Sequence, residues 1–165
     1  MSTSRPPLRD ADARLLELGI ILPAPPQPAA NYLPFRRAGD LLFIAGQVPF
    51  VDGRLPVPGK LGEGLTVAQG QEQAAIATLN AVSIASAANS GLRGLTLVQL
   101  MVFVASSPWF IEQHIVANGA SDILVDIFGA AGEHARTAIA VPCLPLDAPV
   151  EVQLTLLAEA ADGSA

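Results

Sequence analysis

Apolar residues recur at helical spacing in two long stretches of the chain. The first begins at Thr66, whose hydroxyl can pair with Gln69 in a capping box, and ends near Gly91, which suits a left-handed helix end. The second runs from about residue 109 to residue 128 and is interrupted near residue 118. These stretches predict the two long helices of the fold.

Strand patterns fill most of the remaining chain. Five segments have the β-branched and aromatic content or the period-two alternation of strands: residues 32–37, 41–45, 97–105, 136–141 and 150–157. The first two flank a Gly39–Asp40 turn and predict a hairpin. The order hairpin, helix, strand, helix, strand, strand predicts an α+β fold with two long helices packed on one face of a single mixed sheet.

The first 30 residues differ in character from the rest. Asp10 can cap a short helix that ends before Gly19, and a linker with four prolines between residues 23 and 28 follows. At 165 residues the chain has room for one domain. We therefore expect an N-terminal helix and proline-rich linker over 1–30 and a single domain over 31–165.

The strand predicted at 97–105 is apolar at nearly every position, which is typical of a strand buried on both faces. The sequence predicts no third long helix that could cover the second face of the sheet. Another copy of the subunit is the simplest cover, so the pattern predicts a homo-oligomer.

Composition and charge exclude several classes of protein. Half of the residues (51%) are hydrophobic and 15% are charged, so a sizeable core is expected and disorder is not. No apolar run reaches the ~18 residues that span a bilayer, and no apolar stretch follows the N-terminal arginines as in a signal peptide. The net charge of −6 disfavours nucleic acid as a partner. We expect a cytoplasmic protein without a membrane or nucleic-acid partner.

Few side chains in the sequence are suited to metal chemistry. Its His and Cys residues are His114, His134 and Cys143, which lack ligand spacing, so no metal site is predicted. The two histidines are expected at the surface or at helix ends, and Cys143 is expected as a small packing residue. Segment 53–60 resembles a phosphate-binding loop, but leucine follows its lysine where Ser or Thr would hold magnesium.

Three short motifs at strand ends point to a known family. They are Ala45-Gly46-Gln47-Val48-Pro49, Arg136-Thr137-Ala138, and Leu144-Pro145 followed by Val150-Glu151-Val152. With these motifs in this order, the chain resembles the RidA/YjgF/YER057c/UK114 family, whose older label is endoribonuclease L-PSP, over about residues 31–158. The resemblance implies a chorismate-mutase-like fold and a homotrimer with clefts between subunits. It also implies hydrolysis of reactive 2-imino or 2-enamino acids to 2-keto acids and ammonia, without a cofactor.

The resemblance implies roles for individual residues. Arg136 stands where the family arginine grips the substrate carboxylate, and its planar fork suits a bidentate grip. Glu151 stands where a family acid positions the attacking water. Gly46 and Ala138 would contribute backbone groups to substrate binding. Phe35 stands where archetypal members have a tyrosine, so the hydroxyl that would touch the substrate is missing.

The same residues have other interpretations. Arg136 could pair with Glu133 or with an acid of a neighbouring subunit. Glu151 could be an ordinary residue of a half-exposed strand, and Phe35 could serve packing alone. Three functions therefore compete: an imine and enamine deaminase, a non-catalytic small-carboxylate binding or regulatory protein, and the ribonuclease of the older family label. The negative charge and the absence of a His pair disfavour the ribonuclease.

Overall fold

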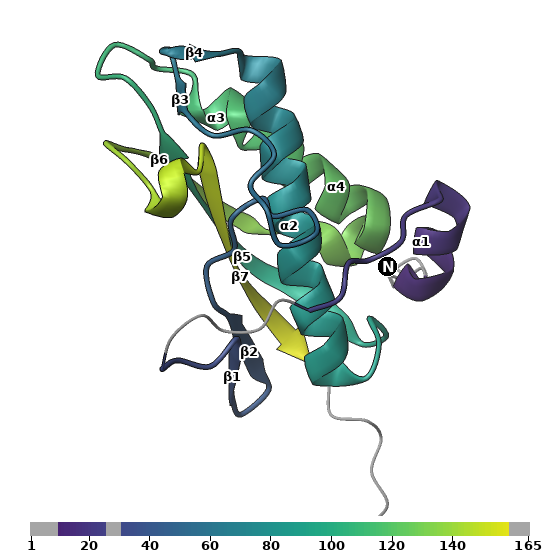
Figure 1. Ribbon diagram of the computed structural model, residues 1–165. Coiled ribbons are helices and arrows are strands. Elements are labelled where there is room, and N and C mark those ends of the chain that lie inside the picture. The colour runs from purple at the N-terminus through teal and green to yellow at the C-terminus, as the bar shows by residue number, and fades with distance from the viewer. Residues whose placement is uncertain (1–9, 26–30, 159–165) are drawn as a thin grey trace, which may run out of the picture.

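One mixed sheet carries helices on one of its faces (Figure 1). The computed structural model describes residues 10–25 and 31–158. Within these residues, a five-stranded sheet has the order β1-β2-β7-β5-β6, in which β5 and β6 are parallel and the other neighbours are antiparallel. The strands are β1 (Phe35–Ala38), β2 (Leu41–Ile44), β5 (Leu95–Ala105), β6 (Ala135–Val141) and β7 (Val150–Ala158).

The helices and two short strands complete the architecture. The helices are α1 (Ala11–Leu18), α2 (Val67–Asn89), α3 (Gln113–Val116) and α4 (Asn118–Phe128). The two-residue strands β3 (Lys60–Leu61) and β4 (Gly64–Leu65) pair with each other before α2. This arrangement confirms the predicted α+β fold, with a single large mixed sheet and helices packed on it.

Helix α2 forms where its sequence predicts. The Thr66 hydroxyl accepts a hydrogen bond from the backbone N–H of Gln69 (3.2 Å). The Gln69 side-chain oxygen accepts one from the backbone N–H of Thr66 (2.9 Å), which completes the capping box. Ser90, one residue before the predicted Gly91, takes the left-handed conformation at the end (φ 58°). Local capping therefore fixes both ends of this helix.

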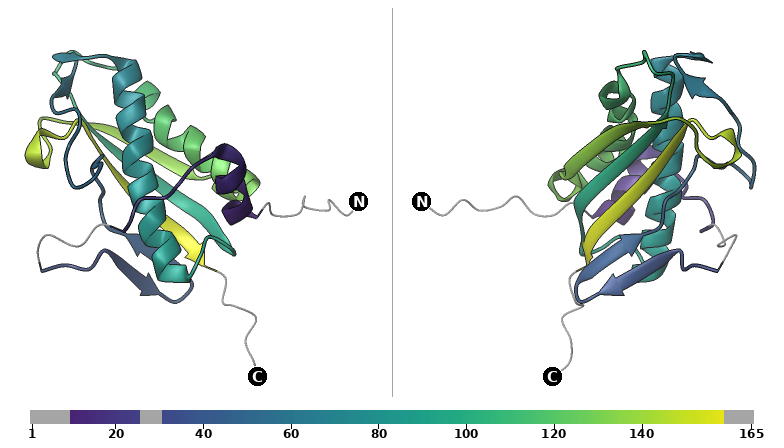
Figure 2. Two further views of the ribbon diagram at one scale, coloured as in Figure 1. Left: turned by 45° about the vertical axis from the view of Figure 1, so that its right-hand side comes forward. Right: turned by 90° about the vertical axis from the view of Figure 1, so that its left-hand side faces the viewer.

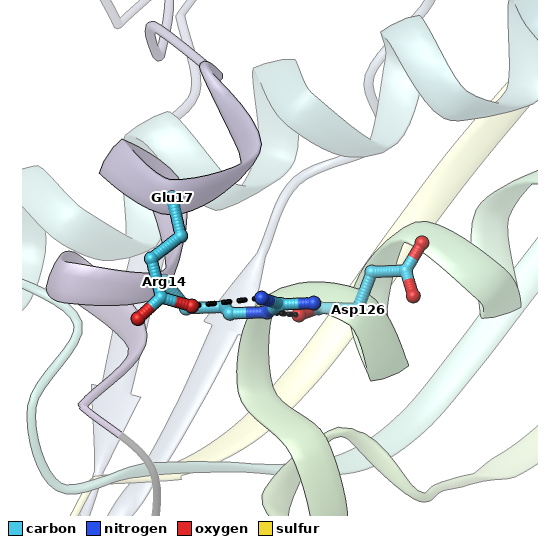
Figure 3. Close-up of polar contacts among 3 residues, drawn as sticks. All are labelled: Arg14, Glu17 and Asp126. Atoms are coloured by element: carbon cyan, nitrogen blue, oxygen red, sulfur yellow. Dashed lines mark hydrogen bonds and ion pairs between the residues drawn. The ribbon is translucent and has the colours of Figure 1, made fainter.

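Helix α1 has the predicted caps and packs against α4. The Asp10 carboxylate accepts hydrogen bonds from two N–H groups of the first turn, and Gly19 is left-handed (φ 66°). Figure 3 shows Arg14, whose Nε donates to the Asp126 carbonyl oxygen of α4 (3.0 Å) and whose Nη1 pairs with Glu17 (2.8 Å). Part of the predicted proline linker, residues 26–30, lies outside the described residues.

Three sequence-based expectations are wrong in detail. The first strand, predicted at residues 32–37, lies at Phe35–Ala38. The second helical region begins at Gln113 rather than near residue 109, because residues 107–110 form a turn that includes Pro108. Cys143, expected as a packing residue, is exposed. It lies in the connection between β6 and β7, where residues 142–147 are mostly exposed.

The two faces of the sheet differ in burial. On the helix side, Leu100, Val102 and Val104 of β5 are fully buried. On the other side, Met101 and Phe103 are only partly buried. In the right-hand view of Figure 2 the strands lie in front of the helices, and no other described element covers them. The strand was predicted to be buried on both faces. Within one chain, only its helix-side face is fully buried.

The apolar helical stretch 113–132 packs in the core of the protein. Among the described residues it is the one stretch long and apolar enough, by length and composition, to cross a membrane. Its residues Ala120, Leu124 and Ile127 are fully buried in the hydrophobic core. Gly119 lies against the Gln71 backbone of α2, where a Cβ atom would collide with the carbonyl group. Core packing against α2 explains the composition of this stretch.

Candidate functional site

Arg136 is positioned by the edge strand β6 and by helix α4. It pairs in register with Leu100 of β5, which is buried on the helix side, so the Arg136 side chain also turns toward the helices. There its Nη1 donates to Asn118 Oδ1 (2.9 Å) and to Ser121 Oγ (3.1 Å). Asn118 and Ser121 are three residues apart and share one face of α4.

The positive charge of Arg136 is not compensated by an acid within the described residues. Both of its protein acceptors are neutral, and no carboxylate lies within ion-pair distance of it in the described ranges 10–25 and 31–158. The predicted alternative of a pair with Glu133 is therefore wrong within one chain. Nε and Nη2 of Arg136 have no hydrogen-bond partner in the described part of the chain, and the side chain is exposed. The N–H groups on this edge of the guanidinium can donate hydrogen bonds to an anion.

His134 belongs to the same polar cluster. Its Nε2 lies 3.1 Å from Ser121 Oγ, and its Nδ1 lies 2.6 Å from the carbonyl oxygen of Gly132. The imidazole is partly buried at the start of β6. Asn118, Ser121, His134 and Arg136 thus form one hydrogen-bonded cluster, called here the arginine cluster.

Glu151 and Gly46 form a second group. Glu151 of β7 pairs with Phe103 of β5, so its side chain lies on the face of the sheet away from the helices. It is half-buried, and desolvation by this burial raises the pKa of its carboxyl group. Gly46 lies directly against the carboxylate, where a Cβ atom would overlap Oε1. The φ angle of Gly46 is not positive, so close approach rather than backbone conformation requires the glycine.

The segment that carries Gly46 is hydrogen-bonded to β7. Gln47 and Val152 exchange two backbone hydrogen bonds, both 2.8 Å long. The Gln47 side chain also donates to the carbonyl oxygens of Ala45 (3.0 Å) and Gly46 (2.8 Å). This network fixes the backbone that lies against the Glu151 carboxylate.

The structure separates the two residues expected to act together. Arg136 is in register with Leu100 and Glu151 with Phe103, and these two β5 residues lie three positions apart on opposite faces of the sheet. Ala138 shares the helix side with Arg136 and packs against the core. One chain therefore carries two groups of candidate residues, Arg136 with Ala138 and Glu151 with Gly46.

Phe35 joins neither group. It lies in β1 at the edge of the sheet opposite to β6, and it is partly buried against the core. Its position within one chain fits the packing interpretation.

The described surface also has a hollow of about 380 Å³ near the carboxyl ends of β5 and β6. Lys60, Glu63, Ser107 and Phe110 are among its lining residues. The Ser107 hydroxyl is buried and has no hydrogen-bond partner in the described ranges. None of the residues predicted for the site lines this hollow.

Comparison with known proteins places the fold and its motifs in a family. Residues 12–159 match the family model described as "YjgF/chorismate_mutase-like, putative endoribonuclease". The chain belongs to this YjgF/chorismate-mutase-like family. The chain is 46% identical to protein TCP17 of Trypanosoma cruzi over 142 residues, which cover 85% of the chain and 89% of TCP17. The resemblance inferred from the sequence motifs is thereby confirmed.

Solved structures of other proteins share the fold. Atu1372 from Agrobacterium tumefaciens, a protein of unknown function, is 38% identical and superposes with a TM-score of 0.84 over 90% of this chain and 92% of its own. Escherichia coli TdcF, solved with bound serine, is 21% identical, with a TM-score of 0.59 over 81% of this chain and 92% of its own. At that identity TdcF supports the fold alone.

Sequence reasoning missed three members of the arginine cluster, Asn118, Ser121 and His134. Their spacing carried a signal. Asn118 and Ser121 lie one helical turn apart, and His134 precedes Arg136 by two residues, so each pair can share one face of its element. That these two faces meet is a tertiary fact that spacing alone does not reveal.

Proposed function

We propose that the protein hydrolyses reactive 2-imino and 2-enamino acids to 2-keto acids and ammonia, as the characterised members of the RidA group do. The observation that carries this proposal is the uncompensated charge of Arg136, whose Nε and Nη2 groups are open to a carboxylate. A 2-imino acid presents a planar carboxylate beside the carbon that water must attack. A bidentate grip on that carboxylate would place the reacting carbon at a fixed distance from the protein.

The active cleft is proposed to lie between subunits of a homotrimer. Arg136 and Glu151 lie on opposite faces of one sheet, so the two act on one substrate only if a neighbouring copy supplies the second residue. The face that carries Glu151 also exposes Phe43 and Ile139, at 38% and 41% of their surface. Burying such apolar residues between copies would favour association.

Glu151 is proposed to act on water. Its carboxylate would accept a proton as the water oxygen bonds to C2 of the protonated imine. The nitrogen then takes up the proton held by Glu151, the C–N bond breaks and ammonia leaves, and the hydroxyl on C2 loses its proton to form the keto oxygen. Burial raises the pKa of Glu151, which makes its carboxylate a stronger base than an exposed glutamate. Gly46 supports this role because its missing side chain leaves room for the carboxylate.

Freshly generated 2-aminoacrylate, followed by 2-keto acid formation, is the direct assay. Wild-type protein should accelerate the appearance of pyruvate over the uncatalysed reaction. Glu151→Gln should lower kcat by about a hundredfold, as expected for loss of a general base, with carboxylate binding retained. Turnover by Glu151→Gln at the wild-type rate would remove Glu151 from the mechanism.

A non-catalytic carboxylate-binding protein is the second candidate. The open guanidinium edge of Arg136 supports it equally, because binding needs no second residue. The serine bound to TdcF, a small molecule with a carboxylate, is compatible with either function. Wild-type protein that binds 2-keto acids through Arg136 and hydrolyses no 2-aminoacrylate would favour this candidate over the deaminase.

A further inference from the structure

The arginine cluster has one consistent direction of hydrogen bonding. The carbonyl oxygen of Gly132 can only accept, so the His134 Nδ1 beside it must carry a proton. In a neutral imidazole, Nε2 is then the acceptor, and the Ser121 hydroxyl donates to it. The Ser121 oxygen keeps its lone pairs for Nη1 of Arg136.

The cluster also determines which edge of the guanidinium stays open. Nη1 has two hydrogens and meets two acceptors, Asn118 Oδ1 and Ser121 Oγ. The remaining edge, made of Nε–H and one Nη2–H, presents two parallel donors in the guanidinium plane. That edge matches the two oxygens of one carboxylate.

The residues that bind the Arg136 guanidinium belong to a well-packed helix. Asn118 and Ser121 belong to α4, which packs closely on α2 at Gly119 and is bonded to α1 through Arg14. A long arginine side chain ordered before binding loses less conformational freedom when a ligand arrives. Neutral partners achieve this order without cancelling the charge.

We propose that Asn118, Ser121 and His134 are positioning residues that orient Arg136 for a single carboxylate bound in its Nε–Nη2 plane. Asn118 and Ser121 act directly on the guanidinium, and His134 acts through the Ser121 hydroxyl. This inference rests on the proposed function, which assigns carboxylate binding to Arg136. It adds the residues that determine how the carboxylate is presented.

Calorimetric titration of the full chain with pyruvate tests the direct contacts. Ser121→Ala should weaken pyruvate binding by about tenfold, since one bond that orients a charged group is lost. Its melting temperature should stay unchanged or rise, because alanine favours a helix. Ser121→Thr keeps the hydroxyl and should retain most of the affinity. Ser86→Ala is the matched control, since Ser86 is a half-buried helical serine of α2 whose hydroxyl makes no hydrogen bond within the described ranges.

A double-mutant cycle tests the indirect role of His134. His134→Ala alone should weaken pyruvate binding by a few fold, less than Ser121→Ala does. In the Ser121→Ala background, His134→Ala should cause no further loss, because the hydrogen-bonded path from His134 to Arg136 runs through the Ser121 hydroxyl. Asn118→Ala should still weaken binding in that background, since Asn118 contacts Arg136 separately.

The outcomes separate this inference from the proposed function. If Arg136→Ala weakens pyruvate binding by roughly ten- to a hundredfold while Ser121→Ala and His134→Ala leave it unchanged, the inference is overturned and the proposed function stands. If wild-type protein binds no pyruvate, or Arg136→Ala binds it normally, both fail. A ¹⁵N NMR measurement on ligand-free protein adds an independent check: neutral His134 should be protonated at Nδ1, and a neutral ring protonated at Nε2 would also overturn the inference.

Discussion

Gly46 lies so close to the Glu151 carboxylate that a Cβ atom at position 46 would overlap Oε1. The two residues are brought together by the backbone bonds between Gln47 and Val152, which extend β2 alongside β7. The absence of a side chain at Gly46 therefore leaves the space that the Glu151 carboxylate occupies. This close approach explains why the Ala45–Pro49 motif has a glycine at position 46.

Gly46→Ala should leave the fold intact and displace the Glu151 carboxylate, because the end of a flexible side chain yields more easily than backbone. We expect 2-aminoacrylate turnover to fall by about tenfold or more, with pyruvate binding through Arg136 retained. Steady-state kinetics and a thermal melt on the same sample check this. Shortening the acid in Gly46→Ala/Glu151→Asp should relieve the overlap and restore any lost stability. Full turnover by Gly46→Ala would contradict the role given to the carboxylate's position.

Glu151→Gln should change how stability depends on pH. Burial raises the pKa of Glu151 in the folded chain, so between its ordinary and its raised pKa the folded state binds more protons than the unfolded state. Stability is therefore lost as pH rises through that window. The glutamine variant avoids this loss, so it should be more stable than wild type at neutral pH and lose that advantage in acid. Urea unfolding at several pH values measures the difference, and equal dependence in both proteins would contradict it.

Arg136→Ala should weaken binding of pyruvate by roughly ten- to a hundredfold, the 1.5–3 kcal/mol or so of a hydrogen bond to a charged group. Arg136→Lys keeps the charge but loses the planar fork and both contacts to α4 in their present geometry. Lysine should therefore recover only a small part of the lost affinity. Titration calorimetry decides, and near wild-type binding by Arg136→Lys would show that charge alone suffices.

Gly119→Ala should destabilise the protein by disturbing the packing of α4 on α2. Its Cβ would collide with the Gln71 backbone of α2, and backbone cannot move aside as a side chain can. We expect a loss of about 1–3 kcal/mol in the free energy of unfolding, the usual cost of overpacking. Urea denaturation measures it. A stable Gly119→Ala would contradict the close packing of α4 on α2.

The local features of this fold were predictable because they depend on neighbouring residues. The capping box of Thr66 and Gln69 and the left-handed Gly19 involve groups within four positions of each other. The start of the second helical region was predicted too early, since apolar spacing continues through the turn at Pro108. Apolar spacing alone does not show that a turn precedes the helix and shifts its first residue to Gln113.

The separation of Arg136 from Glu151 was not predictable from the sequence. The face of each side chain depends on the register of β6 and β7 on β5, which is set by long-range pairing. The motif order indicated the family and the residue types, but it carried no information on faces. The arginine cluster was missed for a similar reason, because Ser121 and His134 meet only once α4 is packed beside β6.

Arg136 and Glu151 are proposed to serve one cleft from different copies of the chain. Mixed trimers test this most directly. Arg136→Ala should turn over 2-aminoacrylate slowly because the substrate is misplaced, and Glu151→Gln because the base is missing. The two chains are unfolded, mixed in equal amounts and refolded together. If each cleft draws its arginine from one copy and its acid from the next, about a quarter of the clefts regain both residues, and 2-aminoacrylate turnover should rise to about a quarter of the wild-type rate. Turnover that stays at the level of the separate variants, in mixtures shown to contain both chains, would contradict the claim.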